Sequence, residues 1–378
     1  MGSFKVLTVR GIPIRIHVTF PLILILAAYQ GGRDFAGGWL NGAALGVVFT
    51  LLLFVCVVLH ELAHSLVALH FNADVKEIVL LPLGGVARME RMPERPYQEL
   101  LMALAGPVAS ALIGIGLALV SVAFIIATSD LGHVIDQVLA GGNGLQWAAL
   151  IPSLALANLF LAAFNLIPAF PMDGGRVLRA LLASFMPHGR ATAIAVTIGQ
   201  GLAWLIGLYG LLRLDVMAML IAVFVYFGAA QERQMLRVKS ALTGIKVRRV
   251  YSRNARSVLP DDPLGRAVDM TLEGFQSDFP VCDGQQLVGM LSQGDILVGL
   301  KEKGAHVPVS LVMRPDPLTV GPDEDLFTVH QKMDQAGASV VPVVEAGEFL
   351  GLLTRRDLEE AYGLVSALPG LWNRGELD

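Results

Sequence analysis

The residues best suited to chemistry lie in one strongly apolar stretch of the chain. His60 and His64 are four positions apart, and Glu61 directly follows the first histidine. On a helix, residues four apart share a face, so two imidazoles are available to one metal ion with a carboxylate beside them. The His-Glu-x-x-His pattern typically holds zinc and supplies a general base. The pattern is short, and a polar patch inside a helix bundle is its alternative interpretation.

A third metal ligand is expected because catalytic zinc takes three protein ligands. Asp173 is the candidate, since it follows a second apolar segment that Pro168 and Pro171 interrupt. Gly174 and Gly175 come next and are expected to permit backbone that other residues cannot adopt. Broken backbone at membrane depth is tolerated only where protein or a wet cavity surrounds it. The alternative is that Asp173 simply caps the following helix.

The composition divides the chain into a membrane part and a soluble part. The 378 residues are only 16% charged, whereas soluble domains carry about 25%. This deficit lies in residues 17–235, while 237–365 have an ordinary soluble composition. The net charge of -4 is too small to indicate nucleic acid, and we expect none. Cys56 and Cys282 are too few for a disulfide framework and suit a reducing compartment.

Six segments are apolar enough to span a bilayer, which requires about 20 residues per helix. They lie near 16–31, 42–70, 98–127, 146–168, 191–212 and 215–232. Basic residues favour cytoplasmic loops, and here they gather in alternate loops: Lys5, Arg10, Arg15; Lys76, Arg88, Arg91, Arg95; Arg176, Arg179, Arg190; Arg233, Arg237, Lys239. We therefore expect a multi-pass protein of the cell (inner) membrane, embedded in the lipid bilayer, with both termini cytoplasmic.

The loop after the second segment has the pattern of a short β-hairpin at the membrane edge. Val75–Leu81 is predicted to be a strand, and Leu83–Arg88 a turn followed by a second strand. Such a hairpin leaves an unpaired strand edge. Gly84 and Gly85 are then candidates for a platform on which a substrate strand pairs by its backbone. The alternative is a simple connector.

The soluble part contains an internal repeat with an offset of 62 residues. Ser292 corresponds to Thr354, and Asp295 corresponds to Asp357. Each repeat has the pattern helix, strand, strand, helix, which indicates two paired supersecondary units. The predicted fold is a polytopic α-helical membrane protein with about six transmembrane helices and a short membrane-edge β-hairpin, followed by an α/β module.

With these motifs, the chain resembles the site-2 protease family of intramembrane metalloproteases, in the branch with C-terminal tandem CBS domains and sporulation-factor-processing relatives. Its two signatures are a membrane H-E-x-x-H and a later N-x-x-P-x-x-x-x-D-G, present here as His60–His64 and Asn165–Gly174. Ala105–Pro107 is similar to the family's A-G-P segment, and Leu83–Gly85 to a turn after its metal helix.

The resemblance divides the chain into a protease and a regulatory module. We expect an intramembrane metalloprotease domain over 1–235, a linker over 236–245, CBS domains over 246–305 and 306–365, and a tail over 366–378.

The resemblance also implies roles for the residues of the membrane part. His60, His64 and Asp173 would be ligands of Zn²⁺, Glu61 the catalytic glutamate, and Asn165 a residue that holds the substrate or the oxyanion. The implied activity is that of a zinc endopeptidase in regulated intramembrane proteolysis. Its partner would be a membrane protein of the anti-sigma-factor or precursor-transcription-factor type. The alternative is a CBS-gated metal-binding transporter or channel, which would need no general base beside its metal.

For the CBS pair, the resemblance implies an adenosine nucleotide such as ATP or AMP. Ser292 or Thr354 would contact a phosphate, and Asp295 or Asp357 a ribose. The helix N-termini that follow Ser292 and Thr354 favour anions. The alternative is that all four residues are ordinary helix caps and the pair binds nothing. Because CBS pairs often associate face to face, a homodimer through this module is also expected.

Overall fold

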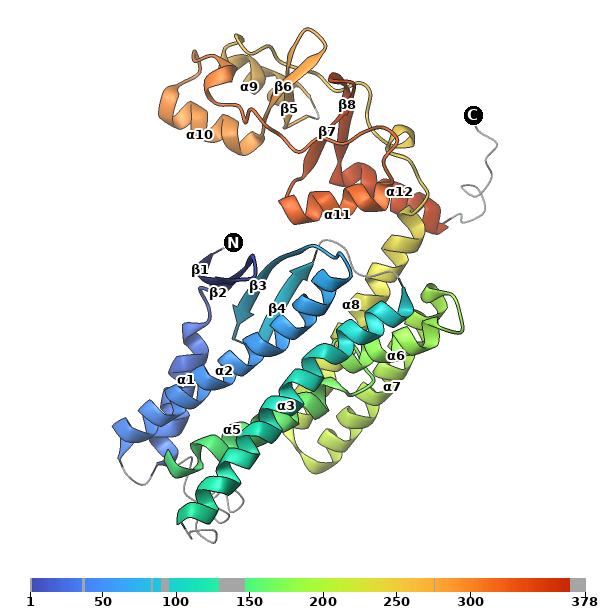
Figure 1. Cartoon of the computed structure of the whole chain (residues 1–378). Helices are drawn as coiled ribbons and strands as arrows, with labels where there is room; N and C mark the ends of the chain where they lie inside the picture. Colours follow the sequence, from blue (N-terminus) through green and yellow to red (C-terminus); the bar gives the residue numbers. More distant parts are fainter. Residues whose placement is uncertain are drawn as a thin grey trace. The chain divides into compact units, whose positions relative to one another are not determined.

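The chain folds into two compact units, Met1–Gln234 and Met235–Asp378, shown in a computed structural model (Figure 1). The structure describes residues 2–35, 38–82, 84–89, 95–128, 147–274 and 276–367. The predicted outer loop around 128–145 and the predicted tail therefore lie almost entirely outside the described residues. The two units are described separately.

The first unit is built mainly from helices. Within the described ranges, four of them are long and apolar enough to cross a membrane. They are α2 (Trp39–His70), α3 (Pro96–Thr128), α7 (His188–Arg213) and α8 (Val216–Leu242). Two further helices are shorter. They are α1 (Pro21–Asp34) and the apolar α5 (Leu150–Asn165), which follows the short η1 (Trp147–Ala149). The amphipathic α6 (Asp173–Ala183) lies between α5 and α7 along the chain.

A helix therefore lies in each of the six apolar segments, but the predicted start of the first one was wrong. The prediction placed that segment at 16–31, whereas residues Ile12–His17 form a strand and α1 begins at Pro21. The helix begins there because proline is favoured in the first turn, where its missing N–H costs nothing. The structure also ends α5 at Asn165, three residues before Pro168.

A four-stranded sheet accompanies these helices, in the order β1 (Ser3–Val9), β2 (Ile12–His17), β3 (Val75–Leu81) and β4 (Gly84–Met89). The predicted β3–β4 hairpin is confirmed. The N-terminal hairpin was missed, although its two-residue turn at Arg10 and Gly11 has the positive φ angles that such turns require.

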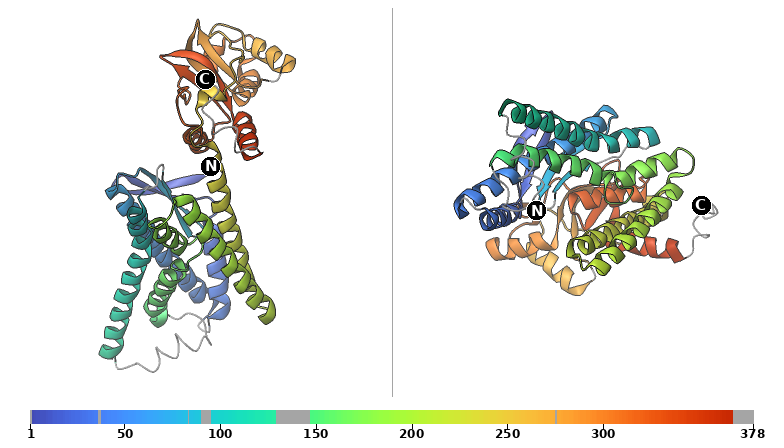
Figure 2. Two further views of the ribbon diagram at one scale, coloured as in Figure 1. Left: turned by 90° about the vertical axis from the view of Figure 1, so that its right-hand side faces the viewer. Right: turned by 90° about the horizontal axis from the view of Figure 1, so that it is seen from below.

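The sheet packs against α2 and lies at one end of the helical bundle of this unit (Figure 2). Ile12, Ile14 and Ile78 are buried against Val58 and Leu62 of α2. Strand β2 pairs with β3 in parallel, so β3 lies in the interior of the sheet. Strand β4 is left as an edge strand of the described sheet, on the side opposite β1.

The second unit has the predicted repeat of helix, strand, strand, helix. Its strands form one sheet in the order β5-β6-β8-β7. The first repeat comprises α9 (Leu264–Glu273), β5 (Phe279–Asp283), β6 (Gln286–Leu291) and α10 (Gln293–Lys303). The second comprises α11 (Leu326–Ala336), β7 (Val340–Glu345), β8 (Glu348–Thr354) and α12 (Arg355–Ala367). The 3₁₀ turns η2 (Val247–Arg249) and η3 (Val309–Leu311) precede the two repeats.

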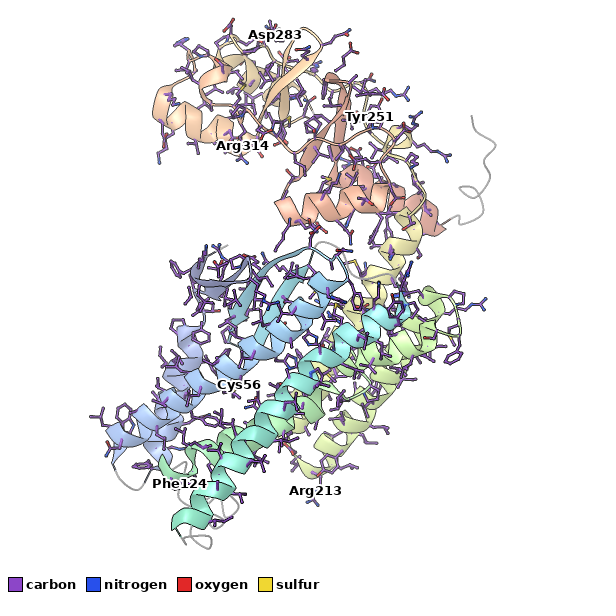
Figure 3. The ribbon with its side chains drawn as sticks, viewed as in Figure 1. Cys56, Phe124, Arg213, Tyr251, Asp283 and Arg314 are labelled. Atoms are coloured by element: carbon purple, nitrogen blue, oxygen red, sulfur yellow. The ribbon has the colours of Figure 1, made fainter. Side chains whose placement is uncertain are left out.

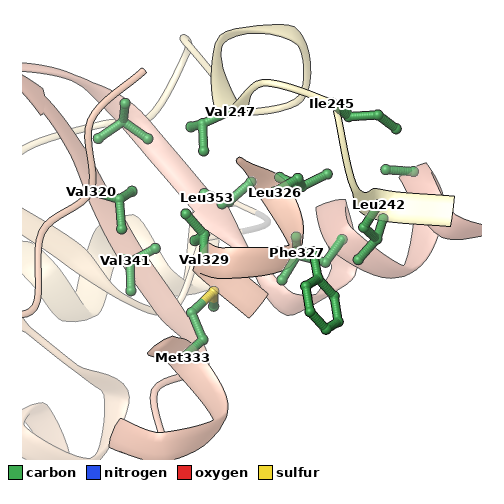
Figure 4. Close-up of a cluster of buried hydrophobic side chains, with 13 residues drawn as sticks. Leu242, Ile245, Val247, Val320, Leu326, Phe327, Val329, Met333, Val341 and Leu353 are labelled. Carbon is green, nitrogen blue, oxygen red and sulfur yellow. The ribbon is translucent and has the colours of Figure 1, made fainter. Parts of the chain in front are cut away.

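Each repeat has its own apolar core. In the second repeat, Val329 and Met333 of α11 pack on Val341 and Leu353 of the sheet (Figure 4). Phe279 and Leu291 occupy the corresponding core of the first repeat. Burial of these side chains, at roughly 1.5–3 kcal/mol each, holds the helices on the sheet.

Candidate metal centre

Three potential metal ligands from α2 and α6 meet in the first unit. His60 Nε2 and His64 Nε2 lie 3.2 Å apart. Asp173 Oδ2 lies 3.2 Å from the first of these nitrogens and 3.1 Å from the second. The side chains are 5%, 6% and 13% exposed, respectively. Among the described residues, these are the His, Cys, Asp and Glu side chains that gather closely enough to hold one ion.

The arrangement of these atoms fits a zinc ion. Tetrahedral ligands with bonds of about 2.0–2.1 Å stand roughly 3.3 Å apart, close to the observed spacing. His64 Nδ1 lies 2.7 Å from the carbonyl oxygen of Met102, which can only accept a hydrogen bond. In the neutral ring, Nδ1 therefore carries the proton, and the Nε2 lone pair faces the Asp173 carboxylate. Two lone pairs this close repel each other unless a proton or a metal ion lies between them, and a metal ion satisfies all three ligand atoms at once.

The capping alternative for Asp173 does not hold. Helix α6 begins at Asp173 itself, and its N-cap residue is Met172, with no side-chain capping bond. The carboxylate is directed to the imidazoles instead.

Helix α3 orients both histidine rings through contacts with their Nδ1 atoms. Ser110 Oγ lies 2.9 Å from His60 Nδ1, and the Met102 carbonyl accepts from His64. Both Ser110 and Met102 are fully buried. Such partners fix ring orientation and ligand basicity in metal sites. Neither residue was predicted from the sequence, although Ser110 stands out as a serine one turn after Gly106 within an apolar helix.

Gly106 is where α3 passes closest to the two rings. A Cβ atom at this position would lie 2.2 Å from His64 Nε2 and 2.7 Å from His60 Nε2. The Ala-Gly-Pro segment thus has a glycine at this position because any side chain would clash with the two imidazoles.

Close packing also explains the glycine pair after Asp173. The expectation of unusual backbone was wrong, because both glycines are helical residues with ordinary φ angles. A Cβ atom at Gly174 would instead lie 2.2 Å from the carbonyl oxygen of Ile167, and one at Gly175 2.7 Å from the backbone of Ala169. The glycines allow the loop before Asp173, which contains a cis Phe170–Pro171 peptide bond, to fold back over the start of α6.

Glu61 lies beside the edge strand β4. A Cβ atom at Gly85 would come within 2.7 Å of Glu61 Cγ, so the strand backbone runs directly along this side chain. Gly84 adopts a φ of +143°, a conformation that favours glycine. Leu83, the first residue of the predicted turn, lies outside the described residues. The structure thus brings the predicted platform and the predicted general base together.

Two asparagines lie on one face of α5. Asn165 is half-buried at the C-terminal end of the helix. Asn158, two turns earlier, was not singled out from the sequence. It is fully buried, donates to the Leu154 carbonyl, and its Oδ1 has no hydrogen-bond partner among the described atoms. Cys56 lies midway along α2 (Figure 3), is buried, and does not belong to the ligand cluster as described.

In the second unit, the four predicted nucleotide contacts are helix caps. Ser292 and Asp295 bond reciprocally at the start of α10. Thr354 and Asp357 do the same at the start of α12, with 2.8 Å between Oγ1 and Oδ2. Arg314 also contacts Asp295 Oδ1 at 3.1 Å. Although partial burial acts to raise it, these hydrogen bonds hold the pKa of Asp295 below its ordinary value.

Comparisons with known proteins match two kinds of domain in this chain. Residues 48–206 match the model of peptidase family M50, and residues 247–302 and 309–363 each match a CBS domain. A zinc metalloprotease of Methanocaldococcus jannaschii is 36% identical over 363 residues, which cover 96% of this chain and 97% of that protein. The stage IV sporulation protein FB of Bacillus subtilis is 26% identical over 64% of this chain and 73% of its own length.

A solved structure is also similar. The site-2 protease from Methanocaldococcus jannaschii is 41% identical, over 61% of this chain and 95% of that one, with a TM-score of 0.44.

Replacing Gly106 by alanine should weaken metal binding. The added methyl group would contact both ligating nitrogens, so we expect zinc affinity to fall by about 10- to 100-fold. The measurement is zinc content per chain after dialysis against a graded chelator. Gly116→Ala is the matched control, because nothing lies within 4 Å of that position on the same helix. Equal zinc retention by the two variants would contradict the described approach of α3.

Proposed function

Because this chain belongs to peptidase family M50, the site-2 protease family, we propose that its substrate is a protein anchored in the same membrane. The family makes the chain an intramembrane zinc metalloprotease, and two CBS domains follow the protease domain. The proposed substrate is of the anti-sigma-factor or precursor-transcription-factor type. The observation that carries the proposal is the meeting of His60, His64 and Asp173 within an apolar helical unit.

The chemistry follows from the residues around this meeting point. His60, His64 and Asp173 would hold the zinc ion, which supplies Lewis acidity when bound. Glu61 would accept the proton of the attacking water and then deliver it to the leaving amide nitrogen. The side-chain amide of Asn165 would donate a hydrogen bond to the carbonyl oxygen as negative charge develops on it.

Strand β4 is the proposed platform for the substrate. A peptide bond inside a helix is shielded by its own hydrogen bonds, so the substrate must unwind before cleavage. An edge strand offers unpaired N–H and C=O groups that satisfy an extended segment. Its Gly85 lies against Glu61, which supports the delivery of such a segment to the general base.

The CBS pair is proposed to modulate cleavage by binding an adenosine nucleotide. The two sites differ in their surroundings. In the first repeat, Arg314 forms an ion pair with Asp295. In the second repeat, the position equivalent to Arg314 is occupied by Ser252, which is neutral and cannot form such a pair with Asp357. Asp357 is therefore the better candidate for contact with a ribose, with Thr354 and its helix N-terminus near the phosphates.

Orientation and assembly complete the proposal. The alternation of basic loops supports cytoplasmic positions for both termini and for the metal-proximal ends of the spans. A homodimer through the CBS module is the proposed assembly.

The general-base role is tested by Glu61→Gln, which keeps the shape of the side chain but cannot accept a proton. We expect cleavage of a candidate single-span substrate to fall by roughly 100-fold or more, with zinc content unchanged. The comparison variant is His60→Ala, which should lose both zinc and activity. Cleavage by Glu61→Gln at a rate near that of the wild type would remove Glu61 from this role.

The platform is tested by disulfide trapping. In a Glu61→Gln background without the two native cysteines, Val86→Cys on β4 is combined with a cysteine scan of the substrate. Strand pairing predicts cross-links at alternate substrate positions, because side chains alternate with a period of two. Val6→Cys on the opposite edge strand β1 is the control and should not cross-link. A period of three to four residues would contradict pairing in an extended form.

Nucleotide control is tested by initial cleavage rates with and without ATP or AMP. We expect a rate change in the wild type that Asp357→Ala abolishes, because the carboxylate that holds the ribose is gone. Asp261→Ala, at an exposed position of the same unit, is the control and should keep the response. A response that persists in Asp357→Ala would place the nucleotide elsewhere.

A further inference from the structure

A buried cluster of charges surrounds Arg179 on α6, apart from the ligand atoms. The side chain of Arg179 is only 6% exposed. Its Nε donates to Glu99 Oε1 at 2.7 Å, its Nη2 lies 2.6 Å from the same oxygen, and its Nη1 contacts Glu232 of α8. His188 Nε2 lies 3.3 Å from the second oxygen of Glu99. Arg179 was predicted to be a basic loop residue, whereas the structure buries it within the unit.

Stability alone is a weak explanation for this cluster. Desolvating charges is costly, and buried ion pairs can often be replaced by apolar residues without loss of stability. A buried ionic cluster can instead fix how the surrounding elements are arranged.

One partner belongs to the helix that orients the histidines. Glu99 lies in the first turn of α3 and is 3% exposed. One turn further along α3, the Met102 carbonyl accepts from His64, and Ser110 then contacts His60. The Arg179–Glu99 contact thus joins α6 to the support of both imidazoles.

The guanidinium group also contacts the segment that leads into Asp173. Arg179 Cζ lies over the ring of Phe170, 5.1 Å from its centroid, which is within cation–π range. Phe170 is 2% exposed and precedes Asp173 by three residues. Helix α8 packs on the same segment, since a Cβ atom at Gly228, one turn before Glu232, would lie 2.4 Å from Pro171 Cδ.

We propose that Arg179 is a positioning residue of the metal centre. It ties the segment before Asp173 to α3, so that the carboxylate on α6 meets the imidazoles on α2 at bonding distance. Arginine suits this task because its planar group binds carboxylates along its edges while its face stacks on an aromatic ring, which lysine cannot do. The inference rests on the proposed role of Asp173 as a zinc ligand.

The test separates positioning from folding by using two variants. Arg179→Met leaves the buried Glu99 with only His188 beside it, and the loss of the arginine charge by itself destabilises the fold. The double variant Arg179→Met/Glu99→Gln removes the two buried charges and leaves only the partly exposed Glu232, so its melting temperature is expected to be close to that of the wild type. Arg190→Met is the control, since that arginine is exposed on α7. The full-length protein in detergent is loaded with Co²⁺, whose visible absorption reports the geometry of its ligands.

We expect the folded double variant to bind cobalt about 10- to 100-fold more weakly than the wild type, with an altered absorption spectrum. Arg190→Met should match the wild type in both measurements. A folded double variant with wild-type affinity and spectrum would overturn the inference. If the double variant does not fold, Arg179→Lys, which keeps the charge, decides by the same two readouts.

A separate variant tests the premise. Asp173→Asn should lose most cobalt affinity whatever the state of Arg179. If it retained full affinity, the ligand role of Asp173 would fail, and the inference with it.

Discussion

The first unit depends on the close approach of three potential metal ligands, His60, His64 and Asp173. Three atoms with lone pairs, two imidazole nitrogens and a carboxylate oxygen, lie 3.1–3.2 Å apart in an apolar bundle. With both histidines neutral and no metal ion between the three atoms, this arrangement would be repulsive. The features around it serve to hold the three atoms together: hydrogen bonds behind each ring, a helix that begins at Asp173, and glycines where backbones approach. The centre is therefore a property of three helices, α2, α3 and α6, rather than of a single motif.

Small residues make this convergence sterically feasible. Gly106 lets α3 pass close to the rings, and Gly174 lets the preceding loop fold over α6. Gly199 of α7 and Gly228 of α8 lie against the same loop, at Ala169 and Pro171 respectively. In membranes, where lipid is as apolar as any side chain, the van der Waals packing that such close backbone approach allows is one of the forces that associate helices. The glycines thus contribute to both the shape of the site and the stability of the bundle.

The sequence was sufficient to predict the parts of the site that follow from local spacing. His60, Glu61 and His64 share one helix, and the prolines before Asp173 mark a break in another, so these residues could be singled out. The repeat in the CBS module likewise predicted its helices and strands. In contrast, Ser110 and Arg179 act through contacts between helices that are far apart in the chain. No periodicity encodes such pairs, so a buried arginine was taken for a loop residue. The N-terminal hairpin was missed because its strands are short and adjoin an apolar helix.

The edge strand beside Glu61 also has a mechanical consequence for any chain that pairs with it. A helix rises about 1.5 Å per residue and a strand about 3.3 Å, so unwinding six residues lengthens that stretch by roughly 11 Å. The flanking polypeptide must move by this additional length. A segment tethered firmly at both ends cannot supply it, whereas one with a free or loosely held end can. If substrates pair with β4 as proposed, spare length in the flanking chain is a condition for cleavage.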